Sequence, residues 1–276
     1  MSSRTISLPA SATRVRFIAV LRSEWIKARS VPAPSITAGA TIGAAALFSL
    51  TVPIMTIIAP LGGTDAGPLI SDAFGVRPSL RALAYGFTLT QPFIAVLGVL
   101  LVTSERASGL LNVTLAAVPK RNPVLGAKLV LSGASGFVLG LLVAGVTMLV
   151  TQPFLIAAGL ADSLWSNVGV QVVLGGAASL ALVSTLGTAL GSLFTNTGAA
   201  AGVVLSFIVV VPSILRLLPG VGGVASQAMP SSAALLLIQP ADIVDWSSLG
   251  IASFILVCWV AAATGVAALR WKRMDV

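Results

Sequence analysis

Residues 168–194 read VGVQVVLGGAASLALVSTLGTALGSLF, from Val168 to Phe194, without one Asp, Glu, Lys or Arg. An α-helix rises about 1.5 Å per residue, so about 20 apolar residues cross the roughly 30 Å hydrocarbon layer of a bilayer. Lipid offers the backbone no hydrogen-bonding partner, and an uncharged run of this length therefore predicts a transmembrane helix. Polar and apolar residues do not alternate along the run, as they would in a strand of a transmembrane barrel.

Five other runs share this length and apolar character. They are Ile36–Ala59, Ala82–Thr103, Val124–Leu149, Ala199–Leu218 and Leu249–Leu269. The composition of the 276-residue chain agrees, because 57% of its residues are hydrophobic and only 9% are charged. About a quarter of the residues are charged in a soluble domain. The sequence therefore predicts an all-α integral membrane protein with six transmembrane helices, the fourth and fifth joined by the short polar turn Thr195–Gly198.

The basic residues lie mostly on one side of these six runs. Lys and Arg collect in the cytoplasmic loops of membrane proteins, and 13 of the 16 basic residues fall on the side that carries both termini. The other side holds Arg77, Arg81 and Arg216 together with five of the eight acidic residues. We therefore expect a multi-pass protein of the cell membrane with both termini in the cytoplasm. The basic residues do not gather on one face with stacking aromatics, so nucleic acid is not an expected partner.

Several chemistries are excluded by missing residue types. The chain has no His and a single cysteine, Cys258, which excludes disulfide frameworks, Cys/His zinc sites and His-based acid–base catalysis. It has no Gly-Lys pair, and therefore no phosphate-binding loop for ATP. No predicted span has a charged residue near its middle, which argues against a proton-coupled carrier. We expect a protein that is not an enzyme and has no catalytic, cofactor-binding or metal site of its own.

Residues 1–33 form an N-terminal segment that we expect in the cytoplasm. Between positions 14 and 29, apolar residues recur at spacings of three and four, which predicts an amphipathic helix. The apolar stripe consists of Val15, Ile18, Leu21, Trp25 and Ala28, and the other faces carry Arg16, Arg22, Lys27 and Arg29. Glu24 supports Lys27 three residues later, and the stretch Val31–Pro34 ends the helix. Such a helix lies in the headgroup layer, either as a plain surface helix or as one that also binds a partner.

The cytoplasmic stretch Glu105–Val118 is too short to span a bilayer. Leu111, Leu115 and Val118 share one face of a helix that Pro119 would end. The stretch predicts a short surface helix, which is either inert or a lever for a cytoplasmic partner.

The external segment between the fifth and sixth spans contains an apolar stretch that is also below the spanning length. It is broken at Pro230, and Ser231 or Ser232 would cap a half-helix over Ala233–Ile238. Backbone at membrane depth is tolerated where protein or a water-filled cavity covers it, so the segment is a candidate re-entrant lid.

Three stretches stand in a fixed order around the six spans. They are Leu21–Ser30 (LRSEWIKARS), Thr103–Leu111 followed by Thr114–Arg121, and Met229–Ser232 before the last span. In this order they resemble the membrane-spanning permease of ABC-2 type exporters. The bias toward Ala, Gly and Val is similar to actinobacterial members, so we expect a bacterial protein.

The resemblance implies a six-helix transmembrane domain over residues 34–276. It would pair with a second permease copy, identical or paralogous, and with two copies of a cytoplasmic ATPase that binds ATP and Mg. Coupling to that ATPase is implied for Glu105, Arg106, Ser108, Gly109, Leu110, Leu111, Leu115 and Val118. The connecting helix would comprise Leu21, Arg22, Glu24, Trp25, Lys27 and Arg29, and the external re-entrant segment Met229, Pro230, Ser231 and Ser232.

The expected function is the translocation half of an ATP-driven exporter. Few side chains in the spans can hydrogen-bond to a cargo, namely Thr88, Gln91, Ser132, Ser135, Gln152, Gln171, Ser184, Thr188 and Ser206. We therefore expect an apolar or amphiphilic cargo, such as a lipid, a hydrophobic peptide or a drug-like antibiotic. Two alternatives stay open. One is a stand-alone channel or secondary carrier with an ion site of Ser, Thr and carbonyl groups, and the other is a membrane scaffold that transports nothing.

Overall fold

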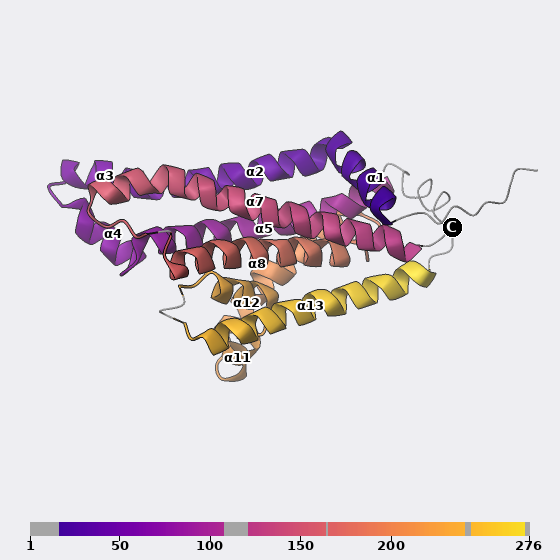
Figure 1. The fold of residues 1–276 in the computed structure, drawn as a ribbon. Helices are drawn as coiled ribbons and strands as arrows, with labels where there is room; N and C mark the ends of the chain where they lie inside the picture. The colour runs from indigo at the N-terminus through magenta and orange to yellow at the C-terminus, as the bar shows by residue number, and fades with distance from the viewer. Residues whose placement is uncertain (1–16, 108–120, 164, 241–243, 274–276) are drawn as a thin grey trace, which may run out of the picture.

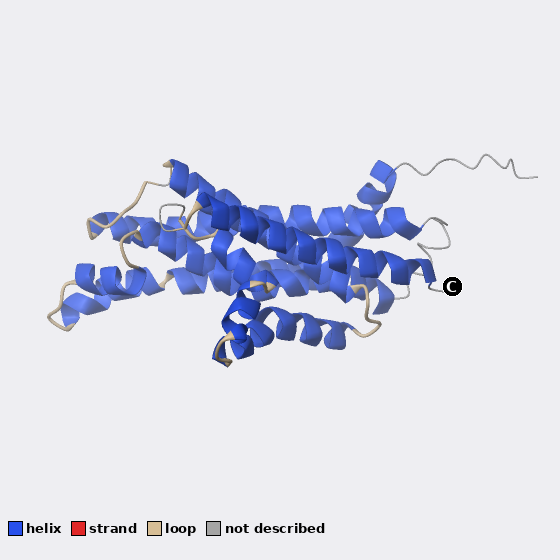
Figure 2. Ribbon diagram, turned by 90° about the horizontal axis from the view of Figure 1, so that it is seen from below, coloured by secondary structure: helices blue, strands red, loops and turns tan. Residues whose placement is uncertain are grey.

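The computed structural model describes residues 17–107, 121–163, 165–240 and 244–273, and all regular structure within these ranges is helical (Figure 2). The helices are α1 (Phe17–Ser30), α2 (Pro32–Ser49), α3 (Thr51–Leu61), α4 (Ala66–Phe74), α5 (Pro78–Ala107), α7 (Arg121–Ala157), α8 (Asn167–Gly191), α9 (Thr197–Leu205), η1 (Ser206–Val210), α10 (Val211–Leu217), α11 (Val221–Gln227), α12 (Pro230–Leu237) and α13 (Trp246–Arg273). Six helical stretches are long and apolar enough to cross a membrane, and they coincide with the six predicted spans. The predicted fold class is confirmed at this level.

The first span consists of two helices, α2 and α3, that meet at Leu50. Pro53 has no backbone N–H, so it cannot bond to the carbonyl of Ser49, which is the last residue of α2. The helix therefore breaks one turn before the proline and resumes at Thr51.

The fifth span contains a wider turn. Between α9 and α10 the five residues of η1 form a π-helix, and the N–H of Val211 bonds to the carbonyl of Ser206, five residues back. Pro212 follows directly and removes the N–H that would bond to Ile208. A π-turn beside a proline keeps the span continuous where an ordinary helix would lose a hydrogen bond.

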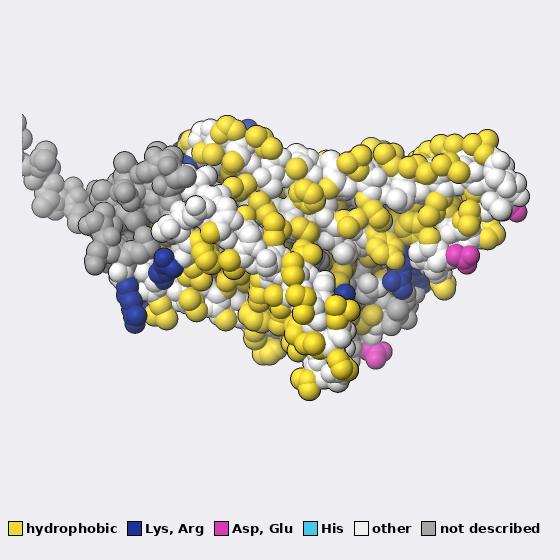
Figure 3. Space-filling view, turned by 180° about the vertical axis from the view of Figure 1, so that it is seen from behind, with side chains coloured by type: hydrophobic (Ala, Val, Ile, Leu, Met, Phe, Trp, Pro, Cys, Tyr) yellow, Lys and Arg dark blue, Asp and Glu magenta, His cyan; other side chains and the backbone are white. Residues whose placement is uncertain are grey.

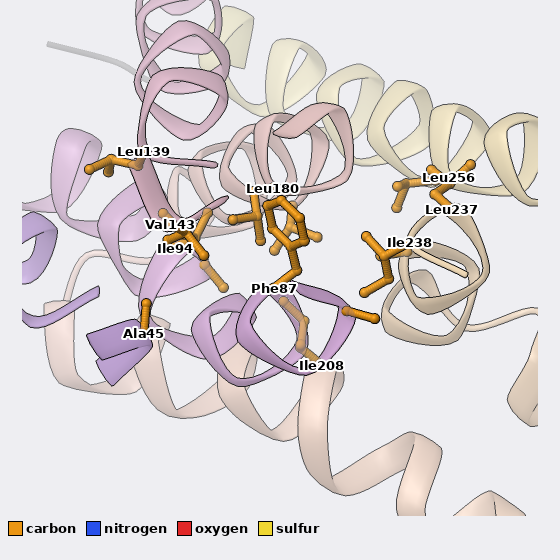
Figure 4. Close-up of a cluster of buried hydrophobic side chains, with 14 of the residues drawn as sticks. Ala45, Phe87, Ile94, Leu139, Val143, Leu180, Ile208, Leu237, Ile238 and Leu256 are labelled. Atoms are coloured by element: carbon orange, nitrogen blue, oxygen red, sulfur yellow. The ribbon is translucent and has the colours of Figure 1, made fainter. Parts of the chain in front are cut away.

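Helix α8 packs against both α5 and α7, and these three helices form the centre of the bundle. Glycine allows their backbones to approach closely. A Cβ atom at Gly98 of α5 would lie 2.1 Å from the carbonyl oxygen of Ser184 in α8, and one at Gly136 of α7 would lie 2.7 Å from that of Leu180. In lipid, helices associate through such close packing. Figure 4 shows the buried side chains beside these contacts, with the ring of Phe87 near Leu180.

Helix α12 is buried against α8 and α13, and α11 lies beside it (Figure 1). The prediction that Ser231 or Ser232 caps this half-helix is wrong. Pro230 already occupies the first helical position, where its fixed φ angle and missing N–H are tolerated, so Met229 is the capping residue. Ser231 and Ser232 lie within the first turn. The position of this segment relative to a bilayer stays a prediction.

Helix α1 and the C-terminal end of α13 lie at the same end of the bundle (Figure 1). Val20 of α1, Val124 of α7 and Trp271 of α13 belong to one buried cluster there. On the face shown in Figure 3, Lys and Arg are seen at this end and again toward the opposite end, whereas Asp and Glu are seen only toward the opposite end, and hydrophobic side chains cover much of the surface between them. We call the end that carries α1 the basic end.

Candidate functional site: a buried ion-pair cluster at the basic end

Helix α1 ends at Ser30 and α2 begins at Pro32, as the Val31–Pro34 stretch predicts. The side of α1 that faces the bundle carries Val20 and Glu24, both buried, whereas Ile18 and Trp25 of the predicted apolar stripe are 75% and 48% exposed. The side of α1 that faces the bundle thus combines the apolar Val20 with the charged Glu24. That α1 lies in a headgroup layer stays a prediction, but this side has partners in the structure.

Four charged side chains meet where α1, the end of α5 and the start of α7 converge. The Nζ atom of Lys128 lies 2.5 Å from Oε2 of Glu24 and 2.6 Å from Oε1 of Glu105. The Nζ atom of Lys27 lies 2.6 Å from Oε1 of Glu24 and 3.8 Å from Oε2 of Glu105. The side chains of Lys128, Glu24 and Glu105 are only 1%, 1% and 4% exposed. We call these four residues the ion-pair cluster.

The two carboxylates of the ion-pair cluster are balanced by its two ammonium groups. Burial alone would raise the pKa of the Glu24 carboxyl, but the neighbouring Lys128 and Lys27 ammonium groups outweigh burial and hold this pKa below its ordinary value of 4.5. Removing one member of a buried ion pair typically costs about 3–5 kcal/mol, because an uncompensated charge stays behind. The cluster therefore resists separation of α1 from α5 and α7.

Sequence reasoning found part of this site. The predicted support of Lys27 by Glu24 is confirmed by their 2.6 Å hydrogen bond. The role of Lys128 was missed, because it was counted only among the basic residues that indicate orientation. Its position one turn inside an apolar span was the available signal, since a charged residue there needs a partner. One of its two partners, Glu24, is 104 residues away in the sequence.

Only two of the predicted coupling residues lie within the described part of the chain. Glu105 and Arg106 belong to the last turn of α5, which ends at Ala107, so a separate surface helix does not begin at Glu105 as expected. The prediction also includes Ser108, Gly109, Leu110, Leu111, Leu115 and Val118, which lie outside the described residues. The described helices on either side of this stretch are α5 and α7, and both contribute to the ion-pair cluster.

The other residues of the predicted connecting helix lie around the cluster. Leu21 is half-buried against the neighbouring hydrophobic cluster that contains Val20 and Trp271, and Arg22 is exposed. The guanidinium of Arg29 lies 5.7 Å from the centre of the Trp25 ring, within the range of a cation–π contact. Arg22, Trp25 and Arg29 are on the same helix as Glu24 and Lys27, but they face outward.

Several polar side chains that the sequence suggested for a cargo pathway instead join helices within the chain. The hydroxyls of Ser132 and Ser184 lie 2.8 Å apart, and the hydroxyl of Thr188 lies 2.7 Å from that of Ser132 and 2.8 Å from the carbonyl oxygen of Gly98, which accepts its hydrogen. All three hydroxyl residues are fully buried. Their hydrogen bonds to each other tie α5, α7 and α8 together, so this group serves packing in the conformation described.

The predicted external segment is also tied to the bundle. Nη2 of Arg216, at the end of the fifth span, donates to the hydroxyl of Ser232 at 3.2 Å. The side-chain amide of Gln171 in α8 donates to the carbonyls of Leu237 and Gln239 at 3.1 and 3.2 Å. The two hydrogen bonds from Gln171 satisfy carbonyl groups at and just after the end of α12, which have no partner inside the helix. A movement of the fifth span would therefore be transmitted to α12 through the hydrogen bond between Arg216 and Ser232.

The chain was compared with family models, curated proteins and solved structures. None of the three matched it. Function therefore has to be argued from the residues and from their geometry.

Proposed function

We propose that this chain is the membrane-spanning permease subunit of an ATP-driven exporter of the ABC-2 type, and that it couples to a separate cytoplasmic ATPase. Six apolar helices fit a membrane transporter-like protein. The observation that carries the finer proposal is the ion-pair cluster. It joins the surface helix α1 to the two helices between which the predicted ATPase-coupling segment runs.

The ion-pair cluster would transmit a movement of the predicted coupling segment to α1. A partner that pushes on the segment between α5 and α7 would act on the end of α5, where Glu105 lies, and on the start of α7, where Lys128 lies. Because both residues share ion pairs with α1, the three helices would move as one body. The packing of α8 against α5 and α7 would carry the movement into the centre of the bundle.

The cargo would be apolar or amphiphilic, because few side chains in the spans can hydrogen-bond to it. Contacts between the helices reduce that number further. The hydroxyls of Ser132, Ser184 and Thr188 are used in contacts between helices and so do not add hydrogen-bonding groups to a pathway. The cargo would pass between two copies of the chain, leave on the side opposite the basic end, and draw its energy from ATP bound by the partner.

The proposal is tested by co-expression with any soluble ATPase, bearing a phosphate-binding loop, that a neighbouring gene encodes. We expect the two proteins to purify together, and Leu111→Asp to weaken their association because a charge would enter an apolar contact. Lys272→Asp, at the exposed end of α13 beyond the predicted span, is the matched control and should leave association unchanged. If the wild-type chain purifies without any ATPase and moves ions down a gradient alone, the exporter proposal is wrong.

A further inference from the structure

A groove of about 290 Å³ opens at the basic end, beside the ion-pair cluster. Its floor is formed by Leu97 and Leu101 of α5, and its sides include Ala38 of α2 and Ala134 and Val138 of α7. Helices α2 and α7 run side by side here (Figure 1). Alanine on both sides leaves the space that larger side chains would fill. The result is an apolar slot whose long walls belong to membrane-spanning helices.

The mouth of the groove is more polar than its interior, because α1 contributes Trp25 and Arg29 there. Trp25 and Arg29 line this end, with the guanidinium 5.7 Å from the centre of the indole ring. Both are exposed, and Arg22 lies on the same face of α1, seven residues before Arg29. Tryptophan is typical of the interface between lipid and water, so the predicted headgroup position of α1 would put the mouth at headgroup level, with the groove extending toward the apolar layer.

The charge at the mouth is positive. Glu24 and Glu105 are the nearest described acids, and both are turned inward and bonded to Lys128. Their charges are balanced by Lys27 and Lys128, so the arginines on the outer face of α1 are left to act on the surroundings. Basic side chains at headgroup level attract anionic lipids.

An apolar slot that ends in an arginine and a tryptophan matches a molecule with an acyl chain and an anionic headgroup. We propose that this groove binds one anionic phospholipid, with an acyl chain between α2 and α7 and the phosphate on the guanidinium of Arg29. Arginine binds phosphate through two parallel N–H donors, which lysine does not offer. A lipid seated there would hold α1 against α2 and α7. The proposal needs only a bilayer around the protein and does not depend on an ATPase.

The experiment is native mass spectrometry of the full-length protein in detergent, with phosphatidylglycerol or phosphatidylcholine of identical chains added in turn. We expect one phosphatidylglycerol to be retained in preference to phosphatidylcholine. Arg29→Gln should weaken retention of phosphatidylglycerol by about fivefold, since one arginine is worth about 1 kcal/mol to an anionic lipid. Retention of phosphatidylcholine should fall less, because its choline ammonium offsets the charge of its phosphate. Ala134→Phe should fill the slot and reduce retention of both lipids.

Two matched variants control for general effects. Arg273→Gln removes an exposed charge at the same end of the molecule, and Leu142→Phe enlarges an exposed side chain of α7 outside the groove. Both should retain lipid as the wild type does. Equal retention of the two lipids by the wild type, or unchanged retention in Arg29→Gln and Ala134→Phe, would show that the groove is not a lipid site.

A photoactivatable phosphatidylglycerol, with its reactive group in the acyl chain, gives a readout that does not depend on variants. It should label α2 near Ala38 and α7 between Ala134 and Val138 in the wild-type protein. Labelling spread evenly over the exposed helices would contradict the proposal. So would loss of labelling on dimerisation, because a second copy of the chain would then be the occupant.

Discussion

Replacing Lys128 with methionine removes the ammonium group that both buried carboxylates of the ion-pair cluster contact. The Nζ atom lies 2.5 Å from Glu24 and 2.6 Å from Glu105, and the lysine side chain is 1% exposed. Breaking a buried pair in this way typically costs about 3–5 kcal/mol. At roughly 2–4 °C per kcal/mol for a chain of this size, the unfolding midpoint should fall by roughly 6–20 °C. Tryptophan fluorescence during heating in one detergent measures the change.

Two further variants separate loss of the ion pairs from loss of a positive charge. Lys272→Met removes an exposed lysine at the same end and should leave the midpoint within about 2 °C, as is usual for surface substitutions. The double variant Glu105→Gln and Lys128→Met removes one charge of each sign and leaves the Lys27–Glu24 pair in place, so it should recover most of the loss because no uncompensated charge remains. If Lys128→Met lowers the midpoint no more than Lys272→Met does, the cluster does not hold the helices together.

Three other predictions concern orientation, packing and pH. In a cysteine-free background, a cysteine at Asn122 should be labelled only from the cytoplasm and one at Gly63 only from outside, and the reverse pattern would overturn the orientation. Gly98→Ala should destabilise the protein by about 1–3 kcal/mol, because its Cβ would lie 2.1 Å from a backbone oxygen of α8, whereas Gly39→Ala meets nothing within 4 Å and should be neutral in the same thermal assay. Because the pKa of Glu24 is lowered, its contribution to stability should be complete above pH 4.5 and be lost as pH falls further, and Glu24→Gln should unfold with a weaker dependence on acid in a pH titration.

The sequence predicts the six spans because their signal is local, resting on length and on the absence of charge. The break at Leu50 and the π-turn at Ser206–Val210 also have local causes, in Pro53 and Pro212. A uniform apolar run does not indicate them unless one asks which carbonyl group each proline leaves without a hydrogen bond. Which side of α1 faces the protein could not be predicted in this way. Its apolar stripe predicts a helix in the headgroup layer, and Ile18 and Trp25 of that stripe are exposed, but nothing in the stripe indicates that Glu24 is buried against the protein.

The ion-pair cluster could not be predicted from the sequence, because its members are far apart along the chain. Glu24 and Lys128 are 104 residues apart, and only the folding of α1 onto the start of α7 brings them together. The same applies to the hydroxyls of Ser132 and Thr188, which composition suggested for a pathway and which the structure places in a contact between helices. Side chains that are scarce in an apolar chain need partners in the fold, and the identity of those partners depends on helix order and register.

The central claim is that the chain moves cargo with energy from a separate ATPase, and transport into inside-out vesicles tests it most directly. Vesicles that contain both proteins should accumulate a fluorescent apolar compound when ATP is added, and vesicles that contain either protein alone should not. A variant of the ATPase without its phosphate-binding lysine should abolish accumulation. Accumulation by this chain alone, driven by an ion gradient and indifferent to ATP, would contradict the account.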